Sequence, residues 1–137
     1  MSNTPQVSRF PLLAAGVAGF TGIGFGAFGA HFLKATLMER GMAVSWETGA
    51  RYHLFHALAL LGIAAWLRAT PAGAGGALGL WVARCWVSGT VLFSGSLYWL
   101  ALGGPRWLGP VTPVGGIILM VGWLLVAIAG AAKRPQL

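Results

Sequence analysis

The chain has 137 residues, of which 57% are hydrophobic and only 8% are charged. Soluble domains carry about 25% charged residues, so this chain has too few charges to cover a soluble surface. Its net charge is +7, from nine Lys and Arg against two acidic residues. The cations stand singly between apolar runs, as topology-setting residues do, and form no basic patch for nucleic acid. We therefore expect one membrane domain over residues 1–137, with the lipid bilayer as its partner and no nucleic acid.

Four apolar segments are each long enough to cross a bilayer, which takes about 20 residues of α-helix. The first is longer than the roughly 7–15 residues of a signal-peptide core, so we expect a span there too. Residues 31–45 are predicted to form a brief amphipathic helix on the membrane surface that stops at Gly41. The predicted fold is an all-α, integral membrane four-helix bundle with short loops and a short interfacial helix after the first span. The four spans are expected at residues 11–30, 48–67, 77–102 and 113–132.

The positions of the cations predict the orientation of the bundle. Cytoplasmic ends of membrane helices are enriched in Lys and Arg. Five cations fall on the side that holds both termini: Arg9, Arg68, Arg84, Lys133 and Arg134. Four fall on the other side, together with both glutamates: Lys34, Arg40, Arg51 and Arg106. We therefore expect both termini in the cytoplasm.

Small residues recur every four positions along the first span and predict a packing ridge. Small side chains allow membrane helices to approach closely, which matters because lipid provides little hydrophobic drive for association. The ridge consists of Ala14, Ala18, Gly22, Gly26 and Ala30. The pattern favours packing within the chain and leaves a contact with a second protomer open.

Polar side chains gather towards one end of the predicted bundle. Such groups are costly inside a membrane and are therefore candidates for function. We hypothesise that His31, Arg51, His56 and Ser94 converge on one partly hydrated pocket between the first three spans. The alternative is that each side chain bonds a separate local partner. The candidate polar pocket comprises His31, Glu47, Arg51, Tyr52, His53, His56, Ser94, Ser96, Tyr98 and Thr112.

Several of these residues have a simple structural interpretation beside the functional one. Glu47 and Arg51 are four residues apart and are expected to pair near a helix N-terminus, or to serve as a charged gate or anion contact. The hydroxyls of residues 93–98 are expected to bond the carbonyl one turn back or to bridge helices.

Metal binding and catalysis both lack support in the sequence. His53 and His56 share a helical face and would supply three imidazoles with His31, but no carboxylate or thiolate stands beside them. Cys85 is the only cysteine, which excludes an internal disulfide and a cysteine-based metal cluster. The chain contains no Cys–His pair, paired carboxylates or nucleotide-binding loop. We expect a protein that is not an enzyme, with no metal and no cofactor.

Four motifs in order resemble those of the "domain of unknown function 423" family of small membrane proteins. They are Gly-Ala-Phe-Gly-Ala-His at 26–31, Thr-Gly-Ala-Arg-Tyr-His-Leu-Phe-His-Ala-Leu-Ala-Leu-Leu at 48–61, Phe-Ser-Gly-Ser-Leu-Tyr at 93–98 and Thr-Pro-Val-Gly-Gly at 112–116. The resemblance covers about residues 12–125 and departs from a commoner Gln-Tyr pairing at Arg51-Tyr52. It implies a four-span protein of the bacterial inner (plasma) membrane and supplies no activity.

Two interpretations of function remain. One is a non-enzymatic protein that binds or moves a small solute or lipid as an oligomer. The other is an accessory or assembly subunit of a larger membrane complex, joined to a second copy or another membrane protein. A proton-coupled cation exporter is disfavoured, because it needs a carboxylate within a span and both glutamates, Glu39 and Glu47, fall near interfaces.

Overall fold

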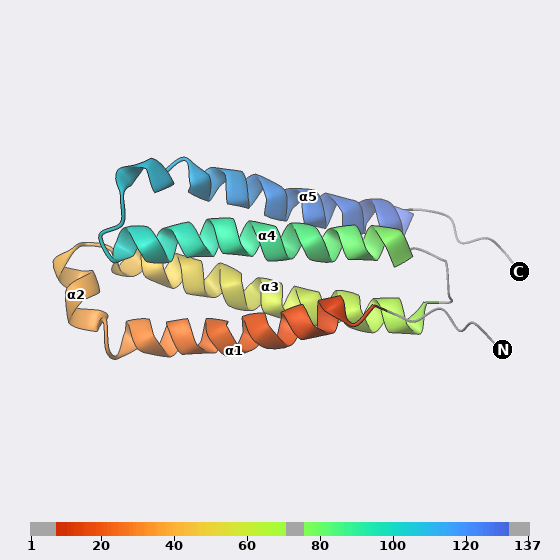
Figure 1. Cartoon of the computed structure of the whole chain (residues 1–137), viewed down its shortest axis with the longest axis horizontal. Helices are drawn as coiled ribbons and strands as arrows, with labels where there is room; N and C mark the ends of the chain where they lie inside the picture. The colour runs from red at the N-terminus through yellow and green to blue at the C-terminus, as the bar shows by residue number, and fades with distance from the viewer. Residues whose placement is uncertain (1–7, 71–75, 132–137) are drawn as a thin grey trace, which may run out of the picture.

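Long α-helices make up most of the structure, a computed structural model that describes residues 8–70 and 76–131 (Figure 1). Four of the helices are long and apolar enough to cross a membrane, which confirms the predicted all-α bundle. A short helix follows the first of them, as predicted. In chain order the elements are α1 (Phe10–Ala30), α2 (Lys34–Glu39), α3 (Ala43–Ala69), α4 (Gly76–Ala101), the 3-10 turn η1 (Arg106–Leu108) and α5 (Val111–Ala131).

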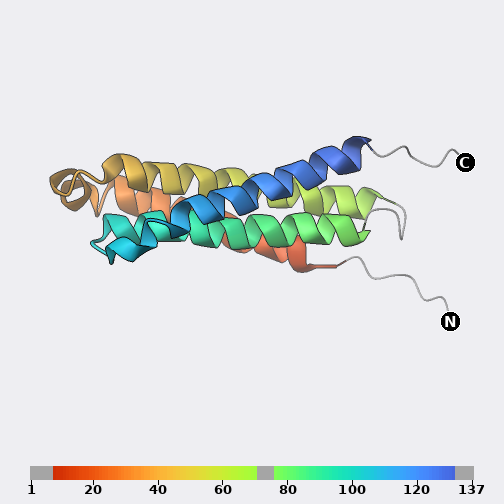
Figure 2. The ribbon, with the colours of Figure 1, turned by 90° about the horizontal axis from the view of Figure 1, so that it is seen from above.

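The helices α3 and α4 form the central pair of the bundle. The helix α1 packs on α3, and α5 packs along α4 on the other side of the pair (Figures 1 and 2). The outer helices therefore turn broad apolar faces away from the protein. Phe20 on α1 is 81% exposed and Met120 on α5 is 71% exposed. Such faces need no protein cover in a bilayer, because lipid solvates apolar side chains.

The turn from α2 into α3 depends on Gly41. This residue has φ of 66°, in the left-handed region that glycine adopts without steric cost. The amide of Met42 then donates to the carbonyl of Leu37 over 2.8 Å, which closes the end of α2. Leu37 is 2% exposed and packs with Trp46, so α2 is held against the bundle.

The helix α3 begins five residues before the apolar span expected from residue 48, because its first turn carries a buried, hydrogen-bonded tryptophan. Trp46 is 2% exposed, and its Nε1 donates to the carbonyl of Phe25 on α1 over 2.9 Å. Hydropathy identifies the part of a helix that suits lipid. The helix itself can begin earlier, where its first residues have packing and hydrogen-bond partners in the protein.

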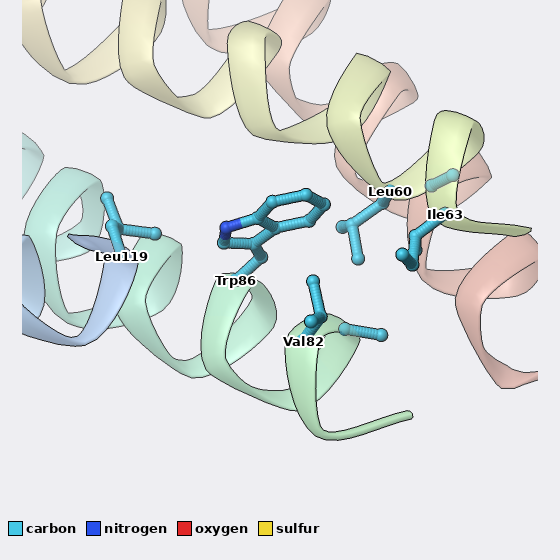
Figure 3. Close-up of a cluster of buried hydrophobic side chains, with 7 residues drawn as sticks. Leu60, Ile63, Val82, Trp86 and Leu119 are labelled. Atoms are coloured by element: carbon cyan, nitrogen blue, oxygen red, sulfur yellow. The ribbon is translucent and has the colours of Figure 1, made fainter. Parts of the chain in front are cut away.

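The core of the bundle is a layer of aliphatic side chains around one indole (Figure 3). Trp86 on α4 extends between α3 and α5, with Leu60 and Leu119 on either side of it. Glycines admit these large groups: a Cβ at Gly89 would lie 2.6 Å from Leu119 Cδ2, and one at Gly122 would lie 2.5 Å from Trp86 Nε1. The buried members are Ala15, Leu60, Ile63, Val82, Ala83, Trp86 and Leu119.

The contact face of α1 differs from the ridge expected from the sequence. Its buried residues are Pro11, Ala15, Gly22 and Gly29. Of the expected ridge, Ala14 and Ala18 are partly buried against the core and Gly22 is buried, whereas Gly26 has open space beside it and Ala30 is exposed. A spacing of four residues drifts by about 40° per step around a helix of 3.6 residues per turn. Over the four steps from Ala14 to Ala30 the ridge therefore turns away from any single partner helix, whereas the spacing of seven from Ala15 to Gly22 to Gly29 stays nearly in line.

Replacing Gly29 with Leu should destabilise the protein by about 1–3 kcal/mol, the range of overpacked cores. Its Cβ would collide with the Trp46 indole and break the bond from Trp46 to α1. Thermal unfolding in mild detergent measures the loss. Gly24→Leu is the matched control, since Gly24 is exposed and a Cβ there meets nothing within 4 Å. Equal melting temperatures for the two variants would contradict this assignment of the contact face.

Candidate functional site

Two histidines on α3 carry the most connected polar groups inside the bundle. They lie three residues apart and diverge, His53 towards α1 and His56 towards α5. Each is bonded through both ring nitrogens to groups on the same or a neighbouring helix. They form the centres of two clusters, one on each side of α3.

The His53 cluster links α1, α3 and α4. Nε2 of His53 lies 3.2 Å from Thr21 Oγ1, and Nδ1 lies 3.4 Å from the Tyr98 hydroxyl. The Thr21 hydroxyl donates its own proton to the carbonyl of Val17 over 2.8 Å, so it accepts from His53 Nε2–H. The Tyr98 O–H then donates to Nδ1. The result is a directed chain of hydrogen bonds from α4 through α3 to α1.

Aromatic rings hold Tyr98 in place for this chain. Phe25 stacks on Tyr98 with ring centroids 4.6 Å apart, and Trp46 lies 4.7 Å from it. A Cβ at Gly49 would lie 3.0 Å from Tyr98 Cε1, so the tyrosine ring also lies directly on the α3 backbone. The phenol therefore has little rotational freedom.

The His56 cluster links α3, α4 and α5. Trp123 Nε1 donates to His56 Nε2 over 3.2 Å, and His56 Nδ1 lies 2.8 Å from the carbonyl of Tyr52. Because an indole only donates, Nε2 is the acceptor and the proton is on Nδ1. The Trp86 and Trp123 rings pack 4.7 Å apart beside the imidazole. The Nε2 lone pair, which would ligate a metal, is thus already used.

A hydroxyl pair joins α4 to α5 nearer the η1 end. The Ser96 hydroxyl donates to the carbonyl of Phe93 over 2.9 Å, as expected for serine in a membrane helix. It also lies 2.7 Å from Thr112 Oγ1, which then donates to it. Tyr52, 42% exposed, packs on Phe93 with centroids 4.6 Å apart.

The remaining predicted site residues do not join these clusters. His31, at the end of α1, is exposed, as are Glu47 and Arg51. Ser94 is buried, as is His56, the one member of the expected four-residue pocket that belongs to a cluster. No ion pair joins Glu47 to Arg51 within residues 8–70 and 76–131. Arg51 and His56 lie five residues apart, about 140° around the helix. The pocket hypothesis grouped these residues by their depth in the membrane. They do not meet, because they point in different directions around their helices.

Three buried polar atoms on α4 have no hydrogen-bond partner among the described residues. They are Trp86 Nε1, Thr90 Oγ1 and Ser94 Oγ, at successive steps of four. The candidate polar pocket expected from the sequence contained Ser94 and neither Trp86 nor Thr90. Thr21 and Trp123 were not among the expected residues either, although Thr21 is the single polar side chain of α1 and Trp123 lies about halfway along a span, where tryptophan is unusual.

No group of three or more His, Cys, Asp or Glu side chains in the described parts of the chain is arranged to hold a metal ion. The imidazoles, phenol and indole instead bond one another across helix interfaces. What this arrangement does chemically is to fix the relative rotation of four helices.

Four apolar helices joined by internal hydrogen bonds define a small polytopic membrane protein. The chain belongs to the family described as "Protein of unknown function (DUF423)", whose model matches residues 25–116. This confirms the resemblance drawn from the four motifs.

Curated bacterial proteins extend the similarity over the chain. The "UPF0382 inner membrane protein YgdD" of Escherichia coli (strain K12) is 41% identical over 137 residues, covering 96% of this chain and 95% of that protein. The "UPF0382 membrane protein YwdK" of Bacillus subtilis (strain 168) is 38% identical over 109 residues, covering 78% and 84%. No solved structure matches.

The bond between His56 and Trp123 should contribute about 0.5–2 kcal/mol to stability, the range for bonds between membrane helices. We expect a double-mutant cycle with His56→Phe and Trp123→Phe, measured by unfolding in mixed detergent, to give a coupling of that size. His56→Phe with Trp99→Phe is the control, because Trp99 is 64% exposed. Additive losses for the first pair would show that the bond contributes nothing.

Proposed function

We propose that this protein is a non-enzymatic accessory or assembly subunit that packs against another membrane helix through α1. The observation that carries the proposal is a second smooth face on α1, separate from the one that contacts α3. Cβ atoms built at Gly19 and Gly26 meet nothing within 4 Å, Ile23 is 65% exposed and Ala30 is exposed. We call Gly19, Ile23, Gly26 and Ala30 the open α1 face.

The spacing of the open α1 face suits a partner helix. Its residues are separated by four, three and four positions, a repeat that keeps a seam in line with a neighbouring helix. Two glycines allow the partner backbone to approach closely, which is how helices associate in lipid. The face also includes two members of the expected ridge: Gly26, whose Cβ position has nothing within 4 Å, and Ala30, which is exposed.

The two histidines inside the bundle support a packing role over a solute path. Both His53 and His56 have their ring nitrogens engaged by groups on the same or a neighbouring helix. A side chain that relays or binds a solute needs a free donor or acceptor. The second proposal is that the protein, as an oligomer, binds or moves a small solute or a lipid. The apolar outer surfaces support a lipid better than the interior of the bundle supports a solute.

Close packing through the open α1 face should yield a specific cross-link. In a Cys85→Ser background, Gly26→Cys should form a disulfide or a bismaleimide adduct in oxidised native membranes. Gly95→Cys is the matched control, because Gly95 is an exposed helical glycine of α4 with nothing within 4 Å of its Cβ. A product of twice the chain mass identifies a second copy, and any other mass identifies a different protein by mass spectrometry. Equal yields from the two variants would contradict the proposal.

The orientation of the bundle is a further part of the proposal, with both termini in the cytoplasm. The start of α1 and the end of α5 lie at the same end of the bundle (Figure 1). Arg9, Arg68 and Arg84 belong to this end, whereas Lys34, Arg40, Arg51 and Arg106 belong to the opposite one, together with both glutamates. With Lys133 and Arg134, which follow α5 in the sequence, the count is five Lys and Arg against four, and this margin of one supports a cytoplasmic placement of both termini.

Reporter fusions test the orientation. Green fluorescent protein fused to either terminus should fluoresce, and alkaline phosphatase at the same positions should be inactive, because the phosphatase folds only outside the cytoplasm. A fusion after Gly104, in the turn at the opposite end, serves as the control and should give the reverse pattern. Active phosphatase at both termini would overturn the assignment.

A further inference from the structure

The outer surface of α1 carries a groove with charged and apolar parts. Its volume is about 630 Å³. It extends from Arg9, just before α1, and from Arg68 in the last turn of α3, along one side of α1 to Phe20. The lining residues are Arg9, Leu12, Leu13, Gly16, Val17, Phe20 and Arg68.

The two arginines bring positive charge to the groove without a compensating acid. The chain has two acidic residues, Glu39 and Glu47, and both lie at the opposite end of the bundle (Figure 1). No ion pair within the described ranges engages Arg9 or Arg68, and both side chains are exposed. Guanidinium groups present a planar fork of donors that fits a phosphate group. The charged end of the groove therefore complements an anionic phosphate.

The rest of the groove complements an acyl chain. Leu13, Val17 and Phe20 are 68%, 56% and 81% exposed, so their side chains form a continuous apolar wall. Gly16 has no side chain and nothing within 4 Å of its Cβ position, which leaves a notch in that wall. From Leu12 to Phe20 the helix rises about 12 Å, within one leaflet of a hydrocarbon core about 30 Å thick.

We propose that this groove binds one anionic phospholipid. Its phosphate lies between the guanidiniums of Arg9 and Arg68, and an acyl chain follows α1 across the notch at Gly16. The charge complementarity selects an anionic headgroup over a zwitterionic one, and the continuous apolar wall selects a lipid over a soluble phosphate. The site lies on the half of α1 nearest its start and uses none of the open α1 face.

Native mass spectrometry of the full-length protein in mild detergent tests the site with phosphatidylglycerol and phosphatidylcholine of equal chain length. We expect a preference for phosphatidylglycerol, and a loss of about tenfold in its affinity on Arg9→Gln/Arg68→Gln, since each basic residue near the surface favours anionic lipid. Arg84→Gln is the matched control. Its guanidinium belongs to the same end, but lies 5.1 Å over the Trp81 ring and outside the groove.

A second variant separates the two parts of the site. Gly16→Leu keeps both arginines and fills the notch, and should weaken phosphatidylglycerol binding while leaving the melting temperature of the lipid-free protein unchanged. Glycerol phosphate in excess should not displace the lipid. The proposal is overturned if Arg84→Gln weakens binding as much as the double variant, if phosphatidylcholine binds equally well, or if glycerol phosphate competes, which would indicate a simple anion site.

Discussion

Close approach of helix backbones at glycine is the constraint on which this structure depends. In a bilayer, lipid solvates apolar side chains as well as a neighbouring helix does, so association relies on tight packing and hydrogen bonds. Gly115 of α5 lies directly on the backbone of Phe93 in α4. Gly29 of α1 instead leaves room for the Trp46 side chain of α3, whose indole lies against it. Each contact brings two helices close enough for a hydrogen bond between them, such as the one that the Thr112 hydroxyl donates to Ser96.

The two histidines show how this closeness determines chemistry. An imidazole inside a membrane segment needs partners for both nitrogens, because neither water nor lipid tails supply them. On α3, one partner of His56 comes from its own backbone and the other from α5, whereas His53 takes Thr21 and Tyr98 from α1 and α4. The opposite proton positions inferred for the two rings follow from these partners. Two histidines only three residues apart on α3 thus point to different neighbouring helices and carry their protons on different ring nitrogens.

The sequence was sufficient for the spans, because runs of about 20 apolar residues have few alternative structures. It was sufficient for Gly41 and for Ser96, whose partners are local in the chain. The sequence was not sufficient where the direction of a side chain around its helix, or a partner far away in the chain, determines which residues meet. Arg51 lies at the membrane depth expected of a pocket residue, but its side chain is exposed. Gly26 continues the four-residue spacing of small residues on α1, but it lies off the face that contacts α3. Trp123 becomes the partner of His56 only once α5 lies along α4, which no local pattern specifies.

The order of the helices in the bundle follows their order in the chain, and this has a consequence for biogenesis. Extensive contacts join α1 to α3, α3 to α4 and α4 to α5, so each long helix packs mainly on the long helix made just before it. When the chain enters the membrane from its N-terminus, each new long helix therefore finds its main packing partner already inserted. Contacts between elements close in sequence cost little loop entropy and form quickly. Each newly inserted helix can dock as it leaves the ribosome and the translocon, and the protein can assemble in step with its own synthesis.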